Sequence, residues 1–348
     1  MKGRSVLLDT LAGRRIAALL RDGVLDDLLV DPPDDASPRP GAIARALPDR
    51  AMKGMGGLFV RMPDGATGYL RGEKPLPPGE PILVQVTALP EPGKAVPLTR
   101  KLLFKSRHAI VTPGAPGLNI SRQIKDEEER GRLRVLAEEA MEGSEMGLIL
   151  RSEATGEDEG EILADIADQR ALAEAVAADT TGDPEWLTEA PDAHTLAWRD
   201  WGRVDEVDTT PGCLAERGVL DEIAALAGPD VPLAQGAWMS VEPTRALVAV
   251  DINTGPDTSP AASLKANLAA LRALPRALRL RGLGGQIAID LAPMSKKDRR
   301  QAEQTAKTAL KACPVETAFI GWTPLGHIEL LRKRERMPLD ASLLKAAL

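Results

Sequence analysis

The sequence predicts an α+β protein that is built from several domains. With 348 residues, the chain is long enough for two or three hydrophobic cores. Short apolar segments separated by Pro and Gly lie before residue 104 and predict strands. Stretches rich in Glu, Ala, Leu and Arg follow with helical periodicity, and residues 236–294 combine apolar strands with a leucine-rich helix. Strands and helices thus occupy partly separate regions, as in α+β proteins.

The composition is that of a folded protein without a membrane segment. Hydrophobic residues make up 43% and charged residues 27% of the chain, and no apolar run approaches the roughly 18 residues of a membrane-spanning helix. The N-terminal stretch "MKGRSVLLDTLAGRR" has no apolar core followed by a cleavage site, so we expect a cytoplasmic protein. The only cysteines, Cys213 and Cys313, form no paired metal motif with the three scattered histidines, and we expect no zinc site.

Charge is unevenly distributed along the chain. The net charge is −7, yet residues 261–336 hold 15 Lys and Arg against 6 Asp and Glu. Residues 125–168 are acidic by contrast, with the runs "KDEEER" and "EDEGE". The sequence therefore predicts one basic end that can hold a polyanion, on a protein that does not bind nucleic acid indiscriminately.

A small antiparallel barrel is predicted after a Pro- and Asp-rich connection at residues 31–42. The segments "GGLFVRM", "TGYLRG" and "PILVQVTAL" are short and apolar, and Pro and Gly turns separate them. Phe59 and Tyr69 fall on neighbouring strands, in a chain with only three Phe and one Tyr. They belong either to the barrel core or to a base-stacking platform of the OB type, and the sequence favours neither alternative.

Two solvated amphipathic helices are predicted at residues 122–142 and 160–178, on either side of the strand "MGLILRS". Residues 179–194 are rich in Asp, Thr, Gly and Pro and are predicted to be a loop. The segment "GVLDEIAAL" predicts a short helix after it.

A hairpin and a long helix are predicted next. The stretch "GAWMSVEPTRALVAVD" gives two strands with a turn at "EPTR". Residues 263–281 give a helix that Pro275 should weaken or kink. Its apolar side carries Leu264, Leu268, Leu271, Leu274 and Leu278.

Two of the predicted strands end in carboxylates. "VAVDINTG" reaches Asp251 and Asn253 after its apolar run, and "GGQIAID" ends at Asp290. A single Asp at a strand end is most often a turn former or a helix cap. Two such strands side by side would bring both carboxylates together, which suits Mg²⁺, or Mn²⁺ in its place, because this cation needs only one or two protein carboxylates besides substrate oxygens. Asn253 would then orient a carboxylate or a water molecule.

Three other side chains have simpler predicted roles. We expect His327 in "GHIELLRKR" to be a packed or capping histidine rather than a general base, since a metal-activated water needs no imidazole. Trp198 and Trp201 are expected to anchor a core rather than to stack on a ligand.

The same region resembles the catalytic region of the ribonuclease E/G family of bacterial endoribonucleases, in sequence and in spacing. The resemblance rests on "VEPTRALVAVDINTG", "NLAALRALPRALRLRGLGGQIAID" and "GHIELLRKR". It implies a divalent-metal-dependent endoribonuclease that hydrolyses single-stranded RNA to 5′-phosphate and 3′-hydroxyl ends in RNA processing or decay.

The resemblance also implies a fold in which an OB-type barrel, a 5′-sensor and an RNase H-like subdomain accompany a DNase I-like catalytic domain. The expected boundaries are residues 1–32 with 196–216 for a reduced RNase H-like subdomain, 33–103 for the OB-type RNA-binding barrel, 104–195 for the 5′-sensor domain and 217–348 for the DNase I-like catalytic domain.

Matched position by position, the resemblance assigns roles to side chains of this chain. Asp251 and Asp290 match metal-binding aspartates, and Asn253 matches a catalytic asparagine. The remaining matches are Phe59, Tyr69 and Lys94 for RNA binding by the barrel, and Arg151, Ser152 and Ile110 for a pocket that receives a 5′-monophosphate. A surface arginine paired with Glu153 or with the acidic helix that follows is the open alternative for Arg151.

Several positions depart from the family pattern. Pro293 and Ala269 stand where the family has acids, and no Cys-Pro-x-Cys zinc link is present. A relative that binds RNA without turnover is therefore an alternative, and a phosphodiesterase acting on DNA or on a small nucleotide is a third. Without the zinc link we expect no zinc, and a monomer or a weak homodimer.

Overall fold

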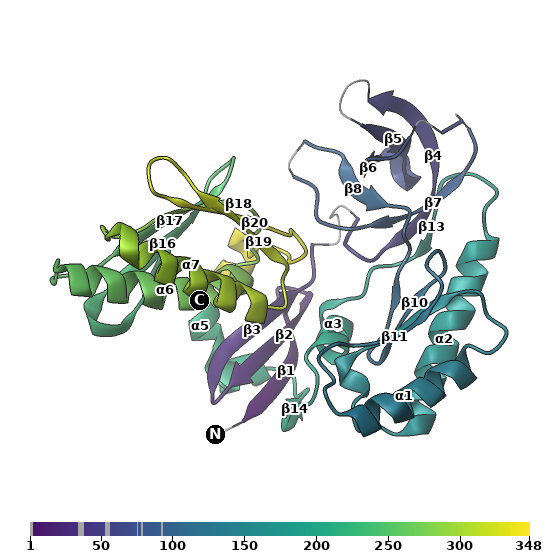
Figure 1. Ribbon diagram of the computed structural model, residues 1–348, viewed down its shortest axis with the longest axis horizontal. Coiled ribbons are helices and arrows are strands. Elements are labelled where there is room, and N and C mark those ends of the chain that lie inside the picture. The colour runs from purple at the N-terminus through teal and green to yellow at the C-terminus, as the bar shows by residue number, and fades with distance from the viewer. Residues whose placement is uncertain (1–2, 34–37, 53–55, 75, 78, 92) are drawn as a thin grey trace. The chain divides into compact units, whose positions relative to one another are not determined.

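Figure 1 shows the computed structural model, which describes residues 3–33, 38–52, 56–74, 76–77, 79–91 and 93–348. The protein has a mixed α and β structure, as the sequence predicts, and its internal contacts divide it into two compact units. The first unit comprises Met1–Asp34 with Val204–Leu348, and the second comprises Asp35–Arg203. The predicted connection at 31–42 includes residues 34–37, which lie outside the described residues. Over the described ranges, no helix has both the length and the apolar character needed to cross a bilayer.

A six-stranded sheet forms the centre of the first unit, with the strand order β15-β16-β17-β18-β20-β19. Its strands are β15 Asp230–Pro232, β16 Trp238–Pro243, β17 Val248–Asn253, β18 Gly285–Asp290, β19 Thr317–Trp322 and β20 Ile328–Arg332. Strands β16 and β17 form the predicted hairpin, but its turn begins at Thr244, two residues after the predicted start. Strands β17 and β18 are parallel, which requires a crossover connection.

That crossover is helix α6 (Pro260–Leu280), which packs with helix α7 (Lys296–Ala312) over one face of the sheet (Figure 1). Strand alternation sends every second side chain of β17 into this core, and α6 continues through Pro275 to its end. The predicted apolar side of α6 is confirmed. Its leucines in the core are Leu268, Leu271, Leu274 and Leu278, with Leu264 packed at the margin.

The N-terminal residues form a second sheet in the first unit, with the order β14-β1-β2-β3. Its strands are β1 Arg4–Leu11, β2 Arg14–Arg21, β3 Val24–Val30 and β14 Glu206–Asp208. Helices α4 (Cys213–Glu216), α5 (Val219–Ala225) and α8 (Ala341–Ala346) share its hydrophobic core. Helix α5 is the short helix predicted at "GVLDEIAAL".

A closed five-stranded barrel lies in the second unit. Its strands are β4 Ile43–Met52, β5 Gly57–Arg61, β6 Thr67–Arg71, β7 Ile82–Val86 and β8 Val96–Thr99. They pair in the order β4-β5-β6-β8-β7, and β7 pairs again with β4, so the closed ring has no free edge. Strands β5, β6 and β7 are the three predicted segments, and this architecture is consistent with an OB-type fold.

The loop predicted at residues 179–194 is wrong in part. Glu185–Thr188 form strand β13, which pairs with β4, and Trp186 packs against the barrel core. The strand was missed because Asp, Gly and Pro surround a short apolar segment, and its stability comes from the barrel rather than from local propensity.

The rest of the second unit is a four-stranded sheet with two long helices. The sheet has the order β11-β12-β10-β9, and the helices α1 and α2 pack against it in one core. Both helices fall in the predicted stretches, and Asp126 and Asp158 cap their N-termini. The elements are β9 Phe104–Lys105, β10 Ala109–Thr112, β11 Leu118–Ile120, β12 Gly147–Leu150, α1 Glu127–Ala140, α2 Glu159–Ala178 and α3 Ala193–Asp200.

Candidate active site

Two carboxylates lie side by side at the ends of β17 and β18. Asp251 and Asp290 are register partners on these parallel strands, and neighbouring strands lie roughly 4.8 Å apart. Because their strand neighbours face the helices, both side chains lie on the opposite face of the sheet. Both are exposed, Asp290 to 66%. The structure therefore places the carboxylates of Asp251 and Asp290 next to each other, as the sequence predicted.

The surroundings of this pair leave it negatively charged. Asn253 donates a hydrogen bond from Nδ2 to Oδ2 of Asp251 over 2.8 Å, which fixes that carboxylate. Within the described ranges, no Lys or Arg forms an ion pair with either aspartate. Two like charges about 4 Å apart repel by about 1 kcal/mol in water, and by more where solvent is excluded. A cation held between them would remove this repulsion.

The donor set fits a hard divalent cation. Two carboxylates supply oxygen ligands, and the open side of the sheet leaves room for water and for substrate oxygens, which is the coordination that Mg²⁺ prefers. The described residues contain no group of three or more His, Cys, Asp and Glu side chains that would hold a metal. Any metal at this place would rely on Asp251 and Asp290.

His327 lies beside this pair, contrary to the expectation of a packed or capping histidine. It precedes β20, its side chain is 35% exposed, and its Nε2 lies 3.5 Å from Oδ1 of Asp290. The prediction failed because β20 pairs antiparallel with β18, which places the start of β20 next to the end of β18.

A buried asparagine holds the segment that follows Asp290. Asn267 of α6 is fully buried, and its Nδ2 donates to the carbonyl of Ala292 over 2.8 Å. The amide N–H of Ala292 donates in return to Oδ1 of Asn267 over 2.9 Å. This pair of hydrogen bonds ties the chain two residues after Asp290 to the helix. The sequence analysis missed it, although a polar residue between Ala266 and Leu268 on the apolar side of a helix was a usable signal.

Departures from the family pattern lie near this segment. Pro293 is exposed and directly follows Ala292, while Ala269 is half-buried on α6. Neither side chain offers a carboxylate near Asp290.

Part of the predicted basic region is interior. Arg279 and Arg332 are buried, and they bond to the backbone carbonyls of Asp26 and Leu283. Their charge supports the fold and does not form a surface for a polyanion. Lysines and arginines that are exposed include Lys265, Arg272, Lys296, Lys297, Arg300, Lys307 and Lys311.

The barrel presents an aromatic pair on its outside. Phe59 and Tyr69 are register partners on β5 and β6, and their ring centroids lie 5.3 Å apart. Their neighbours Leu58 and Leu70 fill the barrel core, so the two rings point outward. Tyr69 lies against Gly57, where any Cβ would collide with its ring. Both rings are half-buried and lie outside the barrel core, so the core alternative is wrong and the base-stacking alternative stays a prediction.

Arginines surround this aromatic pair. Arg61 and Arg71 lie two residues beyond Phe59 and Tyr69 on the same strands, and so share their face. The guanidinium of Arg50 lies 5.3 Å from the centre of the Phe59 ring. The sequence analysis missed all three, although the period-two spacing of Arg61 and Arg71 was visible.

Lys94 lies in the connection that leads to β8. Its side chain is 66% exposed, and its Nζ pairs with Glu91 over 2.7 Å. No contact joins Lys94 to either aromatic ring within the described residues.

Arg151 follows β12 and is extensively bonded. Its guanidinium donates to the carbonyls of Ser106, Arg107 and Arg199, and its Nη2 pairs with Asp200 over 2.9 Å. Its Nε lies 3.6 Å from Oε2 of Glu153. The predicted pairing with an acid is present, although Asp200 was not foreseen because it is 49 residues away in the sequence.

The other two predicted pocket residues lie close by. Ser152 donates its hydroxyl to Oε2 of Glu153 over 3.1 Å. Ile110 lies within β10, between Lys105 of β9 and Ile149 of β12. Arg151 and Ser152 are neighbours in the sequence, the predicted partner Glu153 contacts both, and Lys105 shares the partner Asp200 with Arg151.

Trp198 does not anchor a core, contrary to expectation. It is 65% exposed, and the guanidinium of Arg107 lies 4.2 Å from its ring centre. Trp201 is buried as predicted. Trp201 is the C-cap residue of α3 and lies outside the helix that carries Trp198, so the exposed helix face of Trp198 does not set the burial of Trp201.

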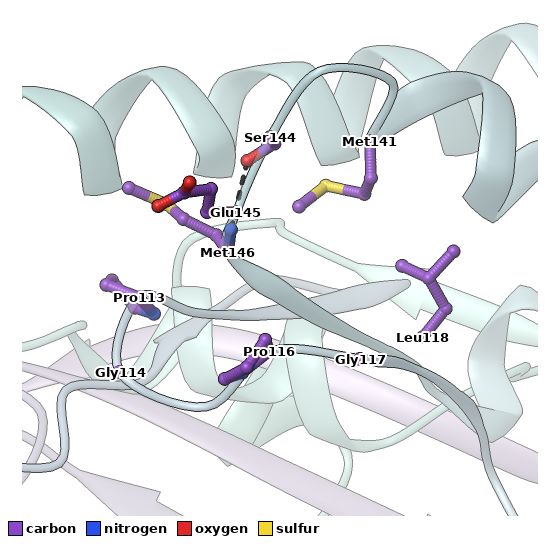
Figure 2. Close-up of a pocket in the computed structure, with 9 residues that line it drawn as sticks. All are labelled: Pro113, Gly114, Pro116, Gly117, Leu118, Met141, Ser144, Glu145 and Met146. Atoms are coloured by element: carbon purple, nitrogen blue, oxygen red, sulfur yellow. Dashed lines mark hydrogen bonds between the residues drawn. The ribbon is translucent and has the colours of Figure 1, made fainter.

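A cavity of about 620 Å³ lies elsewhere in the second unit (Figure 2). Met141 and Met146 line one side of it, and Pro113, Pro116 and Leu118 line the other. Met146 precedes β12 whereas Arg151 follows it, so this cavity lies at the opposite end of that strand. None of the predicted site residues lines it.

The structure has a five-stranded barrel and a sheet with an exposed carboxylate pair, and sequence comparison identifies the family of the chain. Residues 104–209 and 202–335 match the Ribonuclease E/G family. The chain is 30% identical to ribonuclease E of Nostoc sp. (strain PCC 7120 / SAG 25.82 / UTEX 2576), over 75% of this chain and 44% of that protein. It is 28% identical to ribonuclease G of Escherichia coli (strain K12), over 75% of this chain and 61% of that protein.

The chain belongs to the ribonuclease E/G family. It spans about half the length of the curated relatives that it matches, 44% for the Nostoc protein and 61% for the Escherichia coli protein.

Proposed function

We propose that this protein is a divalent-metal-dependent endoribonuclease that hydrolyses single-stranded RNA to 5′-phosphate and 3′-hydroxyl ends, in RNA processing or decay. Family membership supports the ribonuclease class, since the matched relatives are named ribonuclease E and ribonuclease G. The observation that carries the proposal is the carboxylate pair. Asp251 and Asp290 lie in register on the open face of a sheet, and no Lys or Arg of the described ranges neutralises them.

Each residue of the pair has a defined part in this proposal. Asp251 and Asp290 would hold Mg²⁺, or Mn²⁺ in its place, and the bound ion would polarise the scissile phosphate and activate water. Asn253 keeps one oxygen of Asp251 fixed, which leaves the other free to bind. Asn267 restrains the chain after Asp290 through Ala292.

The barrel supplies a surface for single-stranded RNA in this proposal. Bases stack on aromatic side chains without regard to sequence, and cationic side chains track the backbone. Phe59 and Tyr69 supply the rings, and Arg61 and Arg71 supply positive charge on the same face. Lys94 is exposed and would contribute charge after leaving Glu91.

The finer architecture belongs to the same proposal. We assign the six-stranded sheet with α6 and α7 to a DNase I-like catalytic domain, and the N-terminal sheet with β14 to a reduced RNase H-like subdomain. The barrel is the OB-type domain, and the sheet with α1 and α2 is the 5′-sensor domain. Support comes from the order of elements along the chain and from the family match.

A second candidate function is RNA binding without turnover. One observation favours it: within the described ranges, no third acid joins Asp251 and Asp290, and Pro293 and Ala269 offer none. Two carboxylates hold Mg²⁺ less firmly than a larger set, because each ligand charge contributes to affinity.

The experiment that decides between them is a cleavage assay with the purified protein. A labelled 5′-monophosphorylated single-stranded RNA is incubated with Mg²⁺ or with a chelator, using wild type, Asp251→Asn and Asp290→Asn. We expect each variant to lose at least about a hundredfold in rate while RNA binding stays within about twofold, because each removes a ligand charge from an exposed site.

Asp230→Asn is the matched control, because Asp230 is an exposed acid in the same sheet, on β15. It should cleave like wild type. Absence of Mg²⁺-dependent cleavage by wild type on single-stranded RNA would favour the binding protein, and cleavage that persists in both site variants would refute the metal assignment.

A further inference from the structure

The cavity between the loop at 113–118 and the turn at 141–146 belongs to none of the sites discussed so far (Figure 2). We propose that it is a docking site for a peptide segment of a partner protein, in which an apolar side chain lies next to Lys or Arg. The cavity lies at the other end of β12 from Arg151, and none of the proposed catalytic or RNA-binding residues lines it, so this role is independent of the proposed function.

The two walls of this cavity are held in place by hydrogen bonds and by a close backbone approach. In one wall, the amide of Met146 donates to the Ser144 hydroxyl over 3.2 Å. In the other, the amide of Ala115 donates to the carbonyl of Thr112 over 3.2 Å. A Cβ at Gly147 would collide with the carbonyl oxygen of Ala115, so the glycine lets this loop lie against the start of β12. Because both walls are fixed before a ligand arrives, binding costs little ordering entropy.

The lining of the cavity is largely apolar. Met141 and Met146 lie on one side, and Pro113, Pro116 and Leu118 lie on the other. Methionine side chains are unbranched and polarisable, so they adapt to apolar partners of different shapes and are common at surfaces that bind several partners. The volume of about 620 Å³ falls within the range of roughly 300–1,000 Å³ that is typical of ligand sites. The cavity therefore has room for at least one large apolar side chain of a partner.

The charge of the cavity is negative. Of the described residues that line it, Glu145 alone is charged, and no Lys or Arg of the described ranges forms an ion pair with this exposed carboxylate. Helix α1 ends at the same place, with Met141 as its C-cap residue and no basic residue in its last turn. A helix C-terminus carries partial negative charge, which adds to that of Glu145. Residues 138–146 hold four Glu and no Lys or Arg. The site therefore favours a cationic ligand and repels the phosphates of RNA.

One cation lies near this helix end, and its guanidinium is already engaged. Arg170 of α2 donates from Nη1 to the carbonyls of Ala140 and Glu142, over 3.1 and 3.4 Å. Its Nε pairs with Glu174 over 2.9 Å. Arg170 thus offsets part of the charge of the helix end and ties α1 to α2, but it does not neutralise Glu145.

The shape of the cavity favours a peptide over a small molecule. Gly114, Pro116 and Leu118 are exposed, so the loop side is open to solvent. A small ligand would leave much of its surface in water here, whereas sites for small molecules bury most of their ligand. A peptide can place an apolar side chain against the methionines and reach Glu145 with a neighbouring Lys or Arg. Apolar anchors in a hydrophobic groove, with complementary charge at its rim, are a common mode of peptide recognition.

The test measures the binding of fluorescein-labelled synthetic peptides to the full chain by fluorescence anisotropy. The probe is a short peptide of Leu and Lys in which each Leu has a Lys beside it. One comparison peptide has Glu in place of every Lys, and another has Ser in place of every Leu. We expect only the Leu–Lys peptide to bind, because it alone offers apolar side chains to the methionines and positive charge to Glu145.

Two variants of the cavity should weaken this binding. Glu145→Lys reverses the charge of the lining and should raise the dissociation constant by a factor on the order of ten. Gly114→Trp should raise it at least as much by adding bulk to the lining. The fold tolerates a side chain there, because the φ of Gly114 is not positive and a Cβ would meet nothing within 4 Å. Glu189→Lys is the matched control, since Glu189 is an exposed acid after β13 in the same unit, and it should bind like wild type.

Methionine methyl signals in NMR spectra locate the bound peptide. The signals of Met141 and Met146 should shift during titration with the Leu–Lys peptide, and Met146→Leu identifies one of them. The signal of Met239, in the core of the first unit, should stay in place.

Three results would overturn the inference. The first is no binding of the Leu–Lys peptide to wild type, and the second is equal affinity of wild type and Glu145→Lys for it. The third is a shift of the Met141 and Met146 signals with a short single-stranded RNA but not with the peptide, which would assign the cavity to RNA. All of these measurements are made without metal or turnover, so a failure of the proposed ribonuclease activity leaves them unchanged.

Discussion

Replacing Asn267 by Ala should destabilise the first unit and, with it, weaken the proposed metal site at Asp251 and Asp290. The Asn267 side chain is fully buried and makes two hydrogen bonds with the backbone of Ala292, which is itself 6% exposed. Truncation leaves a buried N–H and a buried C=O without partners, and each unsatisfied group costs about 1–3 kcal/mol. We therefore expect the free energy of unfolding to fall by about 2–5 kcal/mol.

The effect should be local before it is global. Hydrogen exchange measured by mass spectrometry on a peptide that covers 285–292 should speed up most, because this segment loses its attachment to α6. Urea unfolding gives the stability change itself. At temperatures where the variant remains folded, the Mg²⁺ concentration for half-maximal cleavage should rise, since Asp290 is held less firmly.

Gln304→Ala is the matched control for this truncation. Gln304 is an exposed amide on α7 in the same unit, and its loss should change stability by no more than about 0.5 kcal/mol. A stability loss below about 1 kcal/mol for Asn267→Ala would refute the reasoning, as would exchange in 285–292 that matches wild type.

Two further predictions concern stability. Asp27 is 3% exposed and pairs with Arg279 and Arg336 at 3.2 Å each, so Asp27→Ala leaves buried guanidinium charge and should cost about 3–5 kcal/mol in urea unfolding; a loss under about 1 kcal/mol would contradict this. The hydrogen bond from Arg132 lowers the pKa of Glu129 from 4.5 to about 2, so the stabilisation is present above about pH 4.5 and is lost as the pH falls towards 2. Stability curves against pH for wild type and Glu129→Gln should therefore converge in acid, and a constant difference between them would count against the assignment.

Strand periodicity predicted the centre of the site because one physical rule governs both strands. In a strand that packs against helices on one face, every second side chain is apolar and faces the helices. A polar residue at an intervening position near the strand end therefore faces the other, open side of the sheet. Asp251 and Asp290 satisfy this pattern, and the α6 crossover makes their strands parallel neighbours. The helix could be predicted from its leucines, so the pairing of the two acids followed from local information.

Long-range partners could not be predicted in the same way. Arg151 pairs with Asp200, and Arg279 with Asp26 and Asp27, over separations of 49 and about 250 residues. A charge count treats these arginines as surface groups, whereas the fold buries Arg279 to 7% exposure. A sequence pattern shows on which side of a helix a residue lies. Only the packing of the helix against other elements determines whether that side faces solvent or contacts a carboxylate from elsewhere in the chain.

Of the two interpretations of Arg151 that the sequence left open, the pairing with acids is present in the structure, and the phosphate pocket stays a prediction. Arg151 is paired with acids, as a surface arginine would be, and it also stands beside the hydroxyl of Ser152, as a phosphate pocket requires. A cation cluster that already holds two carboxylates binds a phosphate only by displacing one of them, so the affinity for the phosphate is a difference between two interactions. Glu153 and Asp200 are these two carboxylates at Arg151, so the internal ion pairs of this cluster oppose the binding of an anion there unless one carboxylate moves away.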